Sequence, residues 1–451
     1  MKNIILIFIV TFIVSCSFDN KTGIWKDITD IEQESQETKS IIEDNISPRY
    51  ESIFTKNQIF NEEKKLLKGV DLRLEEPTAI YNWPETYGSK NNNFSNLAYS
   101  ASNTLIFKSK KLSNSKHKRN FLFYENNLIS YDHKGKIFIY SLKYKKKLFE
   151  FNFYKKNFKN FKKEIYIAVE KNILYAADNL GYMYAIDLNR KKLIWAKNFG
   201  IPFRSNIKIV GKQIFLANQD NVIYSVDTEN GDKNWRFSSS ITFLKSDFIN
   251  NFSIDKRNNL LFFINTSGEL YSINYLTQKI NWVLNFKDSS SSNVTDLFLS
   301  QPIVIKNNNL LISTDKAIIS YNTLSGTKNW NFPSNSILKP VVTENYTYIF
   351  SKNKLLICIE NITGEVLWSK NIYNSLNNKI KNKIVKFTEL KIANSELNLF
   401  SESGYLLNLN HNSGKVEYVK QISKNGINSE IIFINNNMFL IDKKNRLLKF
   451  N

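Results

Sequence analysis

The chain has 451 residues, of which 42% are hydrophobic and 14% aromatic, and it carries a formal net charge of +21 at pH 7. This apolar content excludes disorder of the whole chain, and the 33 Phe and 22 Tyr favour strands over helices. The length allows two or three average domains, but an all-β propeller can also reach this size as one closed unit.

The first fifteen residues are typical of a bacterial export signal, because Lys2 is followed by an apolar run from Ile4 to Val14. This run has about half of the ~20 residues that a membrane-spanning helix needs, so a permanent transmembrane anchor is the weaker alternative. The run that ends in Ser15-Cys16 resembles the lipobox of bacterial lipoproteins. We therefore expect a signal peptide over residues 1–15.

The lipobox resemblance implies that Cys16 becomes the mature N-terminus and carries acyl chains, such as palmitate, that anchor the protein in a membrane. A plain secretory signal is the alternative. Ser17, where an Asp would retain a lipoprotein in the inner membrane, implies delivery to the periplasmic face of the outer membrane. The other cysteine, Cys358, lies in an apolar run and is expected to be a small buried strand residue.

Charge divides the chain after Cys16 into two parts. Ser17 to Glu76 holds 14 acidic and 9 basic residues, net −5, and Pro77 to Asn451 carries +25. No repeat is found in residues 16–76, which are predicted to be an acidic tether, with any short helices around Glu62 to Lys68. The basic part favours anionic partners, although a chain rich in Lys, Asn and Ile also fits a compositional bias of the source genome. An exported protein is not expected to bind nucleic acid.

A repeat becomes visible when the tryptophans are aligned, since an aromatic residue follows a polar one by eight positions. The pairs are Asp187/Trp195, Asp227/Trp235, Asn274/Trp282, Asn322/Trp330 and Glu360/Trp368, with Ser141/Phe149 and Asn410/Tyr418 as weaker copies. Each of these seven copies predicts a β-hairpin whose second strand contains the aromatic residue. We expect these aromatic residues to be structural and to pack between neighbouring sheets.

The turn of each hairpin has its own signal, because the fourth residue after the polar one needs a positive φ. This position holds Gly231, Gly326, Gly364 and Gly414 in four copies and Lys145, Lys191 and Gln278 in the others. Upstream of each hairpin lies another apolar segment, which predicts the inner strands of a four-stranded blade.

The eighth copy is split between the two ends of the chain. Residues 447–451 match the first strand of the hairpin and then stop, whereas Ala79 to Trp83 matches the missing strand with its tryptophan. An N-terminal strand that completes the last blade would remove open sheet edges. The sequence therefore predicts an all-β, eight-bladed β-propeller over residues 77–451, with Trp83 in the closing strand.

The strand, Asp or Asn, Gly and Trp pattern resembles the quinoprotein-type propeller repeat. With the lipobox and eight repeats, the chain looks like the BamB lipoproteins of the outer-membrane β-barrel assembly machinery, and Asn82-Trp83-Pro84 is similar to alphaproteobacterial members. The resemblance implies a scaffold without a cofactor that docks on the periplasmic part of BamA and works with the other subunits. It also implies assistance in the folding and insertion of outer-membrane proteins, which could themselves be bound while unfolded.

Two contact sites are implied by the same resemblance. Arg204, after Phe203 in a predicted loop, looks like an arginine through which BamB contacts BamA, and Asp247 resembles the acidic loop of the next blade. An arginine beside an exposed Phe203 would have the composition of an interface hot spot. The alternative is that these are ordinary surface charges. Asn250 and Asn251 stand where the family has prolines, which leaves the alignment near Asp247 uncertain.

Two rival functions remain open. Quinone-dependent dehydrogenases share the repeat but carry adjacent cysteines, a calcium site and a catalytic Asp, and no two cysteines are adjacent here. The three histidines do not lie at a spacing typical of metal ligands, so neither a catalytic residue nor a metal site is expected. A propeller lipoprotein that serves another envelope complex is the second rival, because the loops and not the fold choose the partner.

Overall fold

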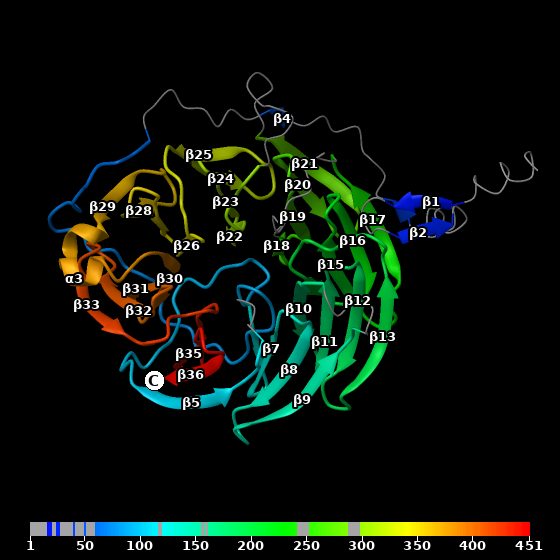
Figure 1. Cartoon of the computed structure of the whole chain (residues 1–451). Helices are drawn as coiled ribbons and strands as arrows, with labels where there is room; N and C mark the ends of the chain where they lie inside the picture. Colours follow the sequence, from blue (N-terminus) through cyan, green and yellow to red (C-terminus); the bar gives the residue numbers. More distant parts are fainter. Residues whose placement is uncertain are drawn as a thin grey trace, which may run out of the picture.

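The computed structural model describes residues 59–115, 120–154, 158, 161–240, 252–286 and 298–451, together with the backbone of four short strands nearer the N-terminus. Its strands form a ring of eight sheets around one axis (Figure 1). This confirms the prediction of an all-β, eight-bladed propeller. The expected signal peptide over residues 1–15 lies outside the described residues.

Each blade is a four-stranded antiparallel sheet, and we number the blades in chain order. Blade 1 is β6 (Leu122–Tyr124), β7 (Asn127–Tyr131), β8 (Lys136–Ser141) and β9 (Lys146–Asn152). Blade 2 is β10 (Ile165–Glu170), β11 (Ile173–Asp178), β12 (Tyr182–Asp187) and β13 (Lys192–Asn198). Blade 3 is β14 (Lys208–Val210), β15 (Gln213–Ala217), β16 (Val222–Asp227) and β17 (Lys233–Ser238). Blade 4 is β18 (Phe252–Asp255), β19 (Leu260–Ile264), β20 (Glu269–Asn274) and β21 (Lys279–Asn285).

The second half of the ring repeats this order. Blade 5 is β22 (Val304–Lys306), β23 (Asn309–Ser313), β24 (Ile318–Asn322) and β25 (Lys328–Phe332). Blade 6 is β26 (Val341–Val342), β27 (Tyr346–Phe350), β28 (Leu355–Glu360) and β29 (Val366–Asn371). Blade 7 is β30 (Phe387–Ala393), β31 (Glu396–Ser401), β32 (Tyr405–Asn410) and β33 (Val416–Gln421). Blade 8 is β34 (Ile432–Ile434), β35 (Asn437–Ile441), β36 (Arg446–Phe450) and β5 (Leu105–Lys111).

The remaining elements are short. β1 (Cys16–Asp19) and β2 (Ile24–Asp27) pair with each other, β3 (Lys39–Ser40) adds in parallel to β17, and β4 (Arg49–Tyr50) adds in parallel to β21. A 3-10 helix (Ile372–Ser375) and α3 (Asn378–Lys381) connect blades 6 and 7. Among the described residues, no helix has the length and apolar character needed to cross a membrane.

The seven predicted hairpins are the third and fourth strands of blades 1 to 7. In every one the aromatic residue pairs with the residue two positions before the polar one, as Ala185 pairs with Trp195 and Cys358 with Trp368. The register then shifts by one residue at the same point in each copy. The repeat is therefore a repeat of backbone geometry, including its bulge.

Four of the tryptophans join neighbouring blades, as expected. Each packs on the turn glycine of the next blade and donates an indole hydrogen bond to a carbonyl of the same turn. The donors and acceptors are Trp195 and Thr228 (3.1 Å), Trp282 and Thr323 (3.0 Å), Trp330 and Asn361 (2.7 Å), and Trp368 and His411 (3.0 Å). Trp235 faces a turn with Gln278 in the glycine position, and its indole nitrogen has no hydrogen-bond partner among the described residues.

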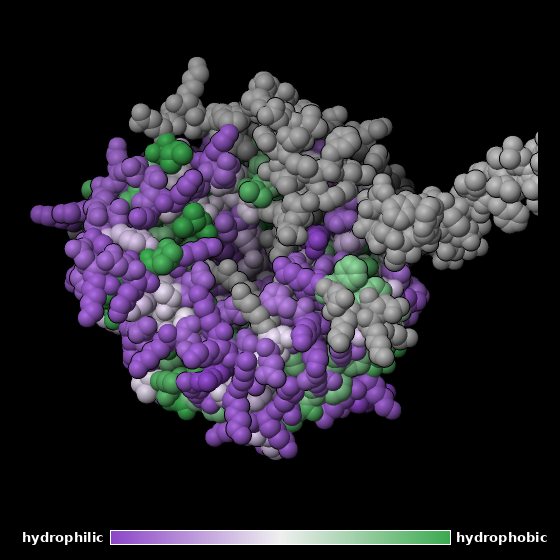
Figure 2. Space-filling view, in the orientation of Figure 1, coloured by the Kyte–Doolittle hydropathy of each residue, from purple (hydrophilic) through white to green (hydrophobic). Residues whose placement is uncertain are grey.

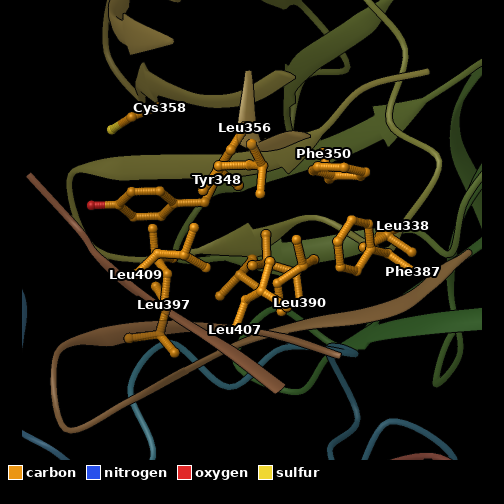
Figure 3. Packing of buried hydrophobic residues seen from close by; sticks show 14 of the residues in the cluster. Leu338, Tyr348, Phe350, Leu356, Cys358, Phe387, Leu390, Leu397, Leu407 and Leu409 are labelled. Atoms are coloured by element: carbon orange, nitrogen blue, oxygen red, sulfur yellow. The ribbon is translucent and has the colours of Figure 1, made fainter. Parts of the chain in front are cut away.

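Apolar side chains fill the space between adjacent blades. Figure 3 shows one such cluster, in which Tyr348 and Leu356 of blade 6 lie over Leu397 and Leu409 of blade 7. Cys358 belongs to this cluster and is fully buried, which confirms the expected role of this cysteine. Burial raises the pKa of its thiol.

An early strand of the chain joins the C-terminal strands in blade 8, but this strand differs from the predicted one. β5 pairs with β36, and Phe107 pairs with Lys449 at the position that tryptophan holds in blades 2 to 6. The prediction that Ala79 to Trp83 forms this strand is therefore wrong. The prediction relied on a five-residue match that required a tryptophan. It therefore selected Ala79 to Trp83 and missed β5, which carries Phe107 at this position.

Trp83 instead belongs to a loop, residues 80–97, that we name the axial loop. It is completely buried and forms an antiparallel bridge with Phe123 of blade 1, and its ring packs against Phe94 at 4.9 Å. In Figure 1 this part of the chain is the light-blue trace in the middle of the ring. Trp83 is thus structural, as expected, but it seals the axis and not the outer edge.

The axial loop contacts all eight blades. The contacts, from blade 1 to blade 8, join Trp83 to Phe123, Pro84 to Val169, Glu85 to Lys208, Lys90 to Ile254, Asn91 to Ile305, Asn93 to Val342, Leu97 to Ile392 and Ile80 to Asn435. Most of these partners lie at the end of the innermost strand of their blade. The loop therefore closes one end of the central channel.

Residues 59–76, in the predicted tether, lie against the propeller. Phe60 donates a backbone hydrogen bond to Pro333 and packs on Phe332, Lys64 bridges to Ser369, and the side chain of Leu72 is buried. No helix is present around Glu62 to Lys68, so that expectation was wrong. Extended backbone here gains hydrogen bonds from the outer strands of blades 5 and 6, which a helix could not make.

Candidate partner-binding site at the open end of the channel

The central channel widens into a cavity of about 480 Å³ at the end opposite the axial loop. Its walls come from residues just before or at the start of the innermost strands, and Tyr87 of the axial loop reaches it from the closed end. Among the described residues, blades 1, 2, 3, 5, 6, 7 and 8 contribute side chains to this lining, so equivalent positions of the repeat form a ring around one opening. These positions were not recognised in the sequence, since the aromatic repeat marks the outer strands.

Charged groups of both signs line the cavity. Lys391 and Glu430 form a buried ion pair, with Nζ 3.5 Å from Oε1, and Lys391 also lies 5.0 Å from the centre of the Trp83 ring. Glu389 accepts a hydrogen bond from the backbone of Ile431 at 2.8 Å. Blades 7 and 8 are thereby joined across the cavity wall.

Lys339 stands apart from these pairs. Its ammonium group contacts the carbonyl of Pro340 at 3.2 Å and lies 5.9 Å from the ring centre of Tyr87, and no carboxylate lies within 4 Å of it among the described residues. Burial lowers the pKa of Lys339 to about 7, and the charge of Lys391 adds to this effect. Lys339 therefore loses its proton more easily than an exposed lysine does.

The loop with Arg204 lies on the same end of the ring, between β13 and β14. Phe203 donates a backbone hydrogen bond to Asp178 of blade 2 and Arg204 donates one to Ala217 of blade 3, so the loop is fixed to both blades. The Arg204 side chain is 15% exposed, and its Nη1 lies 3.7 Å from Oε2 of Glu164, which lines the cavity. The structure thus brings Arg204 to the mouth of the channel.

Phe203 does not lie where the sequence reasoning placed it. Its side chain is completely buried between the two blades, with Phe199 5.2 Å away and Tyr224 6.2 Å away between ring centres. The expectation of an exposed Phe203 at an interface is therefore wrong. The prediction treated an apolar loop residue as exposed, but this loop packs into the hydrophobic core between blades 2 and 3.

The other proposed residues have different positions. Asp247 lies outside the described residues. Cys16 is the first residue of β1, and the structure describes only its backbone. Trp195, Trp235, Trp282, Trp330 and Trp368 are all buried, far out on the fourth strands of their blades. Within the described part of the chain, no three His, Cys, Asp or Glu side chains converge closely enough to hold a metal ion.

Comparison with known proteins agrees with the repeat. Residues 145–370, half of the chain, match the family model described as outer membrane protein assembly factor BamB. No curated protein sequence matches the chain. Among solved structures, BamB from Moraxella catarrhalis superposes with a TM-score of 0.59 at 12% identity, covering 77% of this chain and 99% of that one.

Other solved structures with the same fold differ in function. The quinohemoprotein alcohol dehydrogenase from Comamonas testosteroni reaches a TM-score of 0.59 at 9% identity and covers 82% of this chain and 80% of its own. The computationally designed protein Ika8 reaches 0.55 at 10% identity and covers 77% of this chain and 99% of its own. These similarities establish the fold alone.

Proposed function

Because this chain belongs to the BamB-like family of β-propellers, we propose that it is a non-enzymatic scaffold of the outer-membrane protein assembly machinery. In this role it binds the periplasmic part of BamA and assists the folding and insertion of β-barrel proteins. The same proposal includes lipidation at Cys16 and a location at the periplasmic face of the outer membrane. It also includes a propeller domain over residues 77–451 and the similarity of Asn82-Trp83-Pro84 to alphaproteobacterial members.

The observation that carries the proposal is the position of Arg204. Its loop is fixed by backbone hydrogen bonds to two blades, so little conformational entropy is lost when a partner binds. Nη1 of Arg204 lies 3.7 Å from Oε2 of Glu164, and a guanidinium at this position can donate a forked pair of hydrogen bonds to a carboxylate of a partner. Asp247 remains a second proposed contact.

The cavity residues do not fit the cofactor of the dehydrogenase rival. A calcium-bound quinone needs carboxylates turned toward the ion. Here Glu164 is paired with Arg204, Glu389 accepts a backbone hydrogen bond, and Glu430 is paired with Lys391. Each of the three cavity carboxylates that the structure describes thus already has a protein partner, and we derive no redox chemistry at this site.

Affinity capture tests the proposal directly. The lipoprotein is recovered from detergent-solubilised membranes as wild type, as Arg204→Glu and as Arg190→Glu. Arg190 is a matched control because its side chain is 83% exposed on a hairpin turn of blade 2. Loss of an interface arginine costs about 2 kcal/mol or more, so BamA recovery should fall by roughly 30-fold or more with Arg204→Glu and stay unchanged with Arg190→Glu.

The thermal midpoint of each variant shows whether the propeller is intact. Undiminished BamA recovery with folded Arg204→Glu would remove Arg204 from the interface. Wild-type protein that brings down a different envelope complex and no BamA would overturn the assembly role in favour of the second rival.

A further inference from the structure

The seam between blades 8 and 1 contains a groove of about 450 Å³. At four other seams the space is filled by a tryptophan on the turn glycine of the next blade. Here the tryptophan position holds Phe107 and the turn position holds Lys145, whose φ is 51°. A smaller ring and a turn residue that extends into solvent leave the seam open.

Lysines surround this groove. Six line it, and all six are exposed: Lys108, Lys110, Lys111, Lys145, Lys146 and Lys147. Lys147 is paired with Glu150 at 2.8 Å. The other five have no carboxylate within 4 Å among the residues that the structure describes. Such a concentration of like charge is unfavourable alone and is relieved when a negatively charged group binds.

The groove also has an apolar floor. Phe107, Leu128 and Phe138 line it below the lysines, and the ammonium of Lys147 lies 4.4 Å from the centre of the Phe138 ring. At the start of β5, Leu105 and Ile106 are 46% and 47% exposed. A ligand that fits this surface carries both negative charge and apolar groups.

β5 is the outermost strand of blade 8, and its outer edge pairs with no described strand. On two other blades the corresponding edge is occupied, because β3 and β4 of the acidic N-terminal part add in parallel to β17 and β21. The rim of this propeller therefore accepts extended segments by backbone pairing. Figure 2 shows hydrophilic residues over most of the described rim, with isolated hydrophobic ones.

We propose that the groove along β5 binds an acidic, extended segment of a partner protein. Its backbone pairs with the free edge of β5, its carboxylates face the five unpaired lysines, and its apolar side chains rest on the floor formed by Phe107 and Phe138. This site lies at the seam of blades 8 and 1, away from Arg204 between blades 2 and 3, and goes beyond the proposed function.

Peptide binding tests this site. The probe is a fluorescein-labelled peptide of three Glu-Val-Glu-Ser repeats, and its fluorescence anisotropy is measured with the full mature protein at low and high salt. The variant Lys110→Glu/Lys146→Glu reverses two groove charges. The control Lys379→Glu/Lys420→Glu makes the same charge change at exposed lysines of α3 and of β33 in blade 7.

We expect the wild-type protein to bind the peptide with an affinity that falls as salt rises. The groove variant should bind the peptide at least about tenfold more weakly, and the control variant within about twofold of wild type. The reason is that the charge of the groove, and not the net charge of the protein, sets the affinity for the peptide. A peptide with Lys in place of Glu should not bind.

Three results would overturn the proposal: no binding of the acidic peptide, equal binding by the folded groove variant, or equal weakening in the control variant. Vesicles of phosphatidylcholine with phosphatidylglycerol separate this site from a membrane-binding surface. If the groove variant loses vesicle binding while the peptide never binds, the ligand is an anionic lipid surface and the peptide proposal is wrong.

Discussion

Lys208 and Glu85 form an ion pair 2.7 Å long whose two side chains are each 1% exposed. Lys208 begins the innermost strand of blade 3, and Glu85 belongs to the axial loop, 123 residues earlier in the chain. Burial alone would raise the pKa of Glu85, but the charges of Lys208 and Lys90 together hold it below its ordinary value. The N-terminal part of the propeller is thereby fixed to the axis by a charge pair inside the protein.

Replacing Lys208 with Met should destabilise the propeller strongly. The change leaves Glu85 with Lys90 alone and removes the hydrogen bonds from Lys208 to Ser89 and Asn92, of 2.7 and 2.6 Å. Breaking a buried pair costs about 3–5 kcal/mol, and equilibrium denaturation measures it. Lys420→Met, at an exposed site, should change stability by less than about 0.5 kcal/mol. A Lys208→Met protein as stable as wild type would show that the pair is not needed.

The turn glycine of blade 6 should not tolerate alanine. A Cβ on Gly364, whose φ is 76°, would lie 2.6 Å from Cγ of Trp330. Gly364→Ala therefore combines backbone strain with overpacking and should cost about 2–4 kcal/mol in denaturation experiments. Gly211→Ala is the matched control, because its φ is 60° and nothing lies within 4 Å of the added carbon. Equal losses for the two variants would mean that backbone strain alone matters.

Lys339 should make the stability of the protein depend on pH. Its pKa is lowered to about 7 in the folded state, whereas an unfolded lysine titrates near 10.4. Between these values the unfolded state binds more protons, so the contribution of Lys339 to the free energy of unfolding rises with pH. The rise is at most about 1.4 kcal/mol per pH unit. Below pH 7 both states are protonated and this contribution no longer changes.

The measurement is the difference between wild type and Lys339→Met in denaturation series from pH 6 to pH 10. Lys339→Met should be more stable at pH 6, and the gap should close as the pH rises. A gap that stays constant would place the folded pKa of Lys339 close to its unfolded value.

Cys16→Ala should release the protein from the membrane, because the substitution removes the residue that we propose to carry the acyl chains. Fractionation of cells that express each form measures the distribution between membrane and periplasm. Retention of the variant in the membrane fraction to the wild-type extent would mean that another feature anchors the protein.

The fold could be predicted because its main signal is local. The eight-residue spacing from Asp227 to Trp235 specifies one hairpin, and seven such copies together with the eighth, split copy give the number of blades. The closing strand could not be identified in this way. Trp83 is the residue type that the pattern requires, whereas β5 carries Phe107 at this position. Only the folded structure shows which of the two segments pairs with β36.

The candidate site was predicted in part for a similar reason. Arg204 was found from a short resemblance, and the structure places it at the channel mouth. The prediction for Phe203 was wrong because its side chain is buried between blades 2 and 3. A local sequence pattern does not show which blades pack against each other. Lys339 and Glu430 carry no motif at all; they matter because separate blades bring them to one cavity.

The sequence by itself determined the strands, the turns and the number of blades, because each depends on residues fewer than about fifty positions apart. Tertiary structure alone decided how the ring closes, that residues 80–97 seal its axis, and that lysines of blades 8 and 1 share one groove. The ring closure and the axial seal join residues 338 and 123 positions apart, and the groove depends on how two neighbouring blades pack. Their energies depend on burial and on the distance between charges, which exist only once the chain is folded.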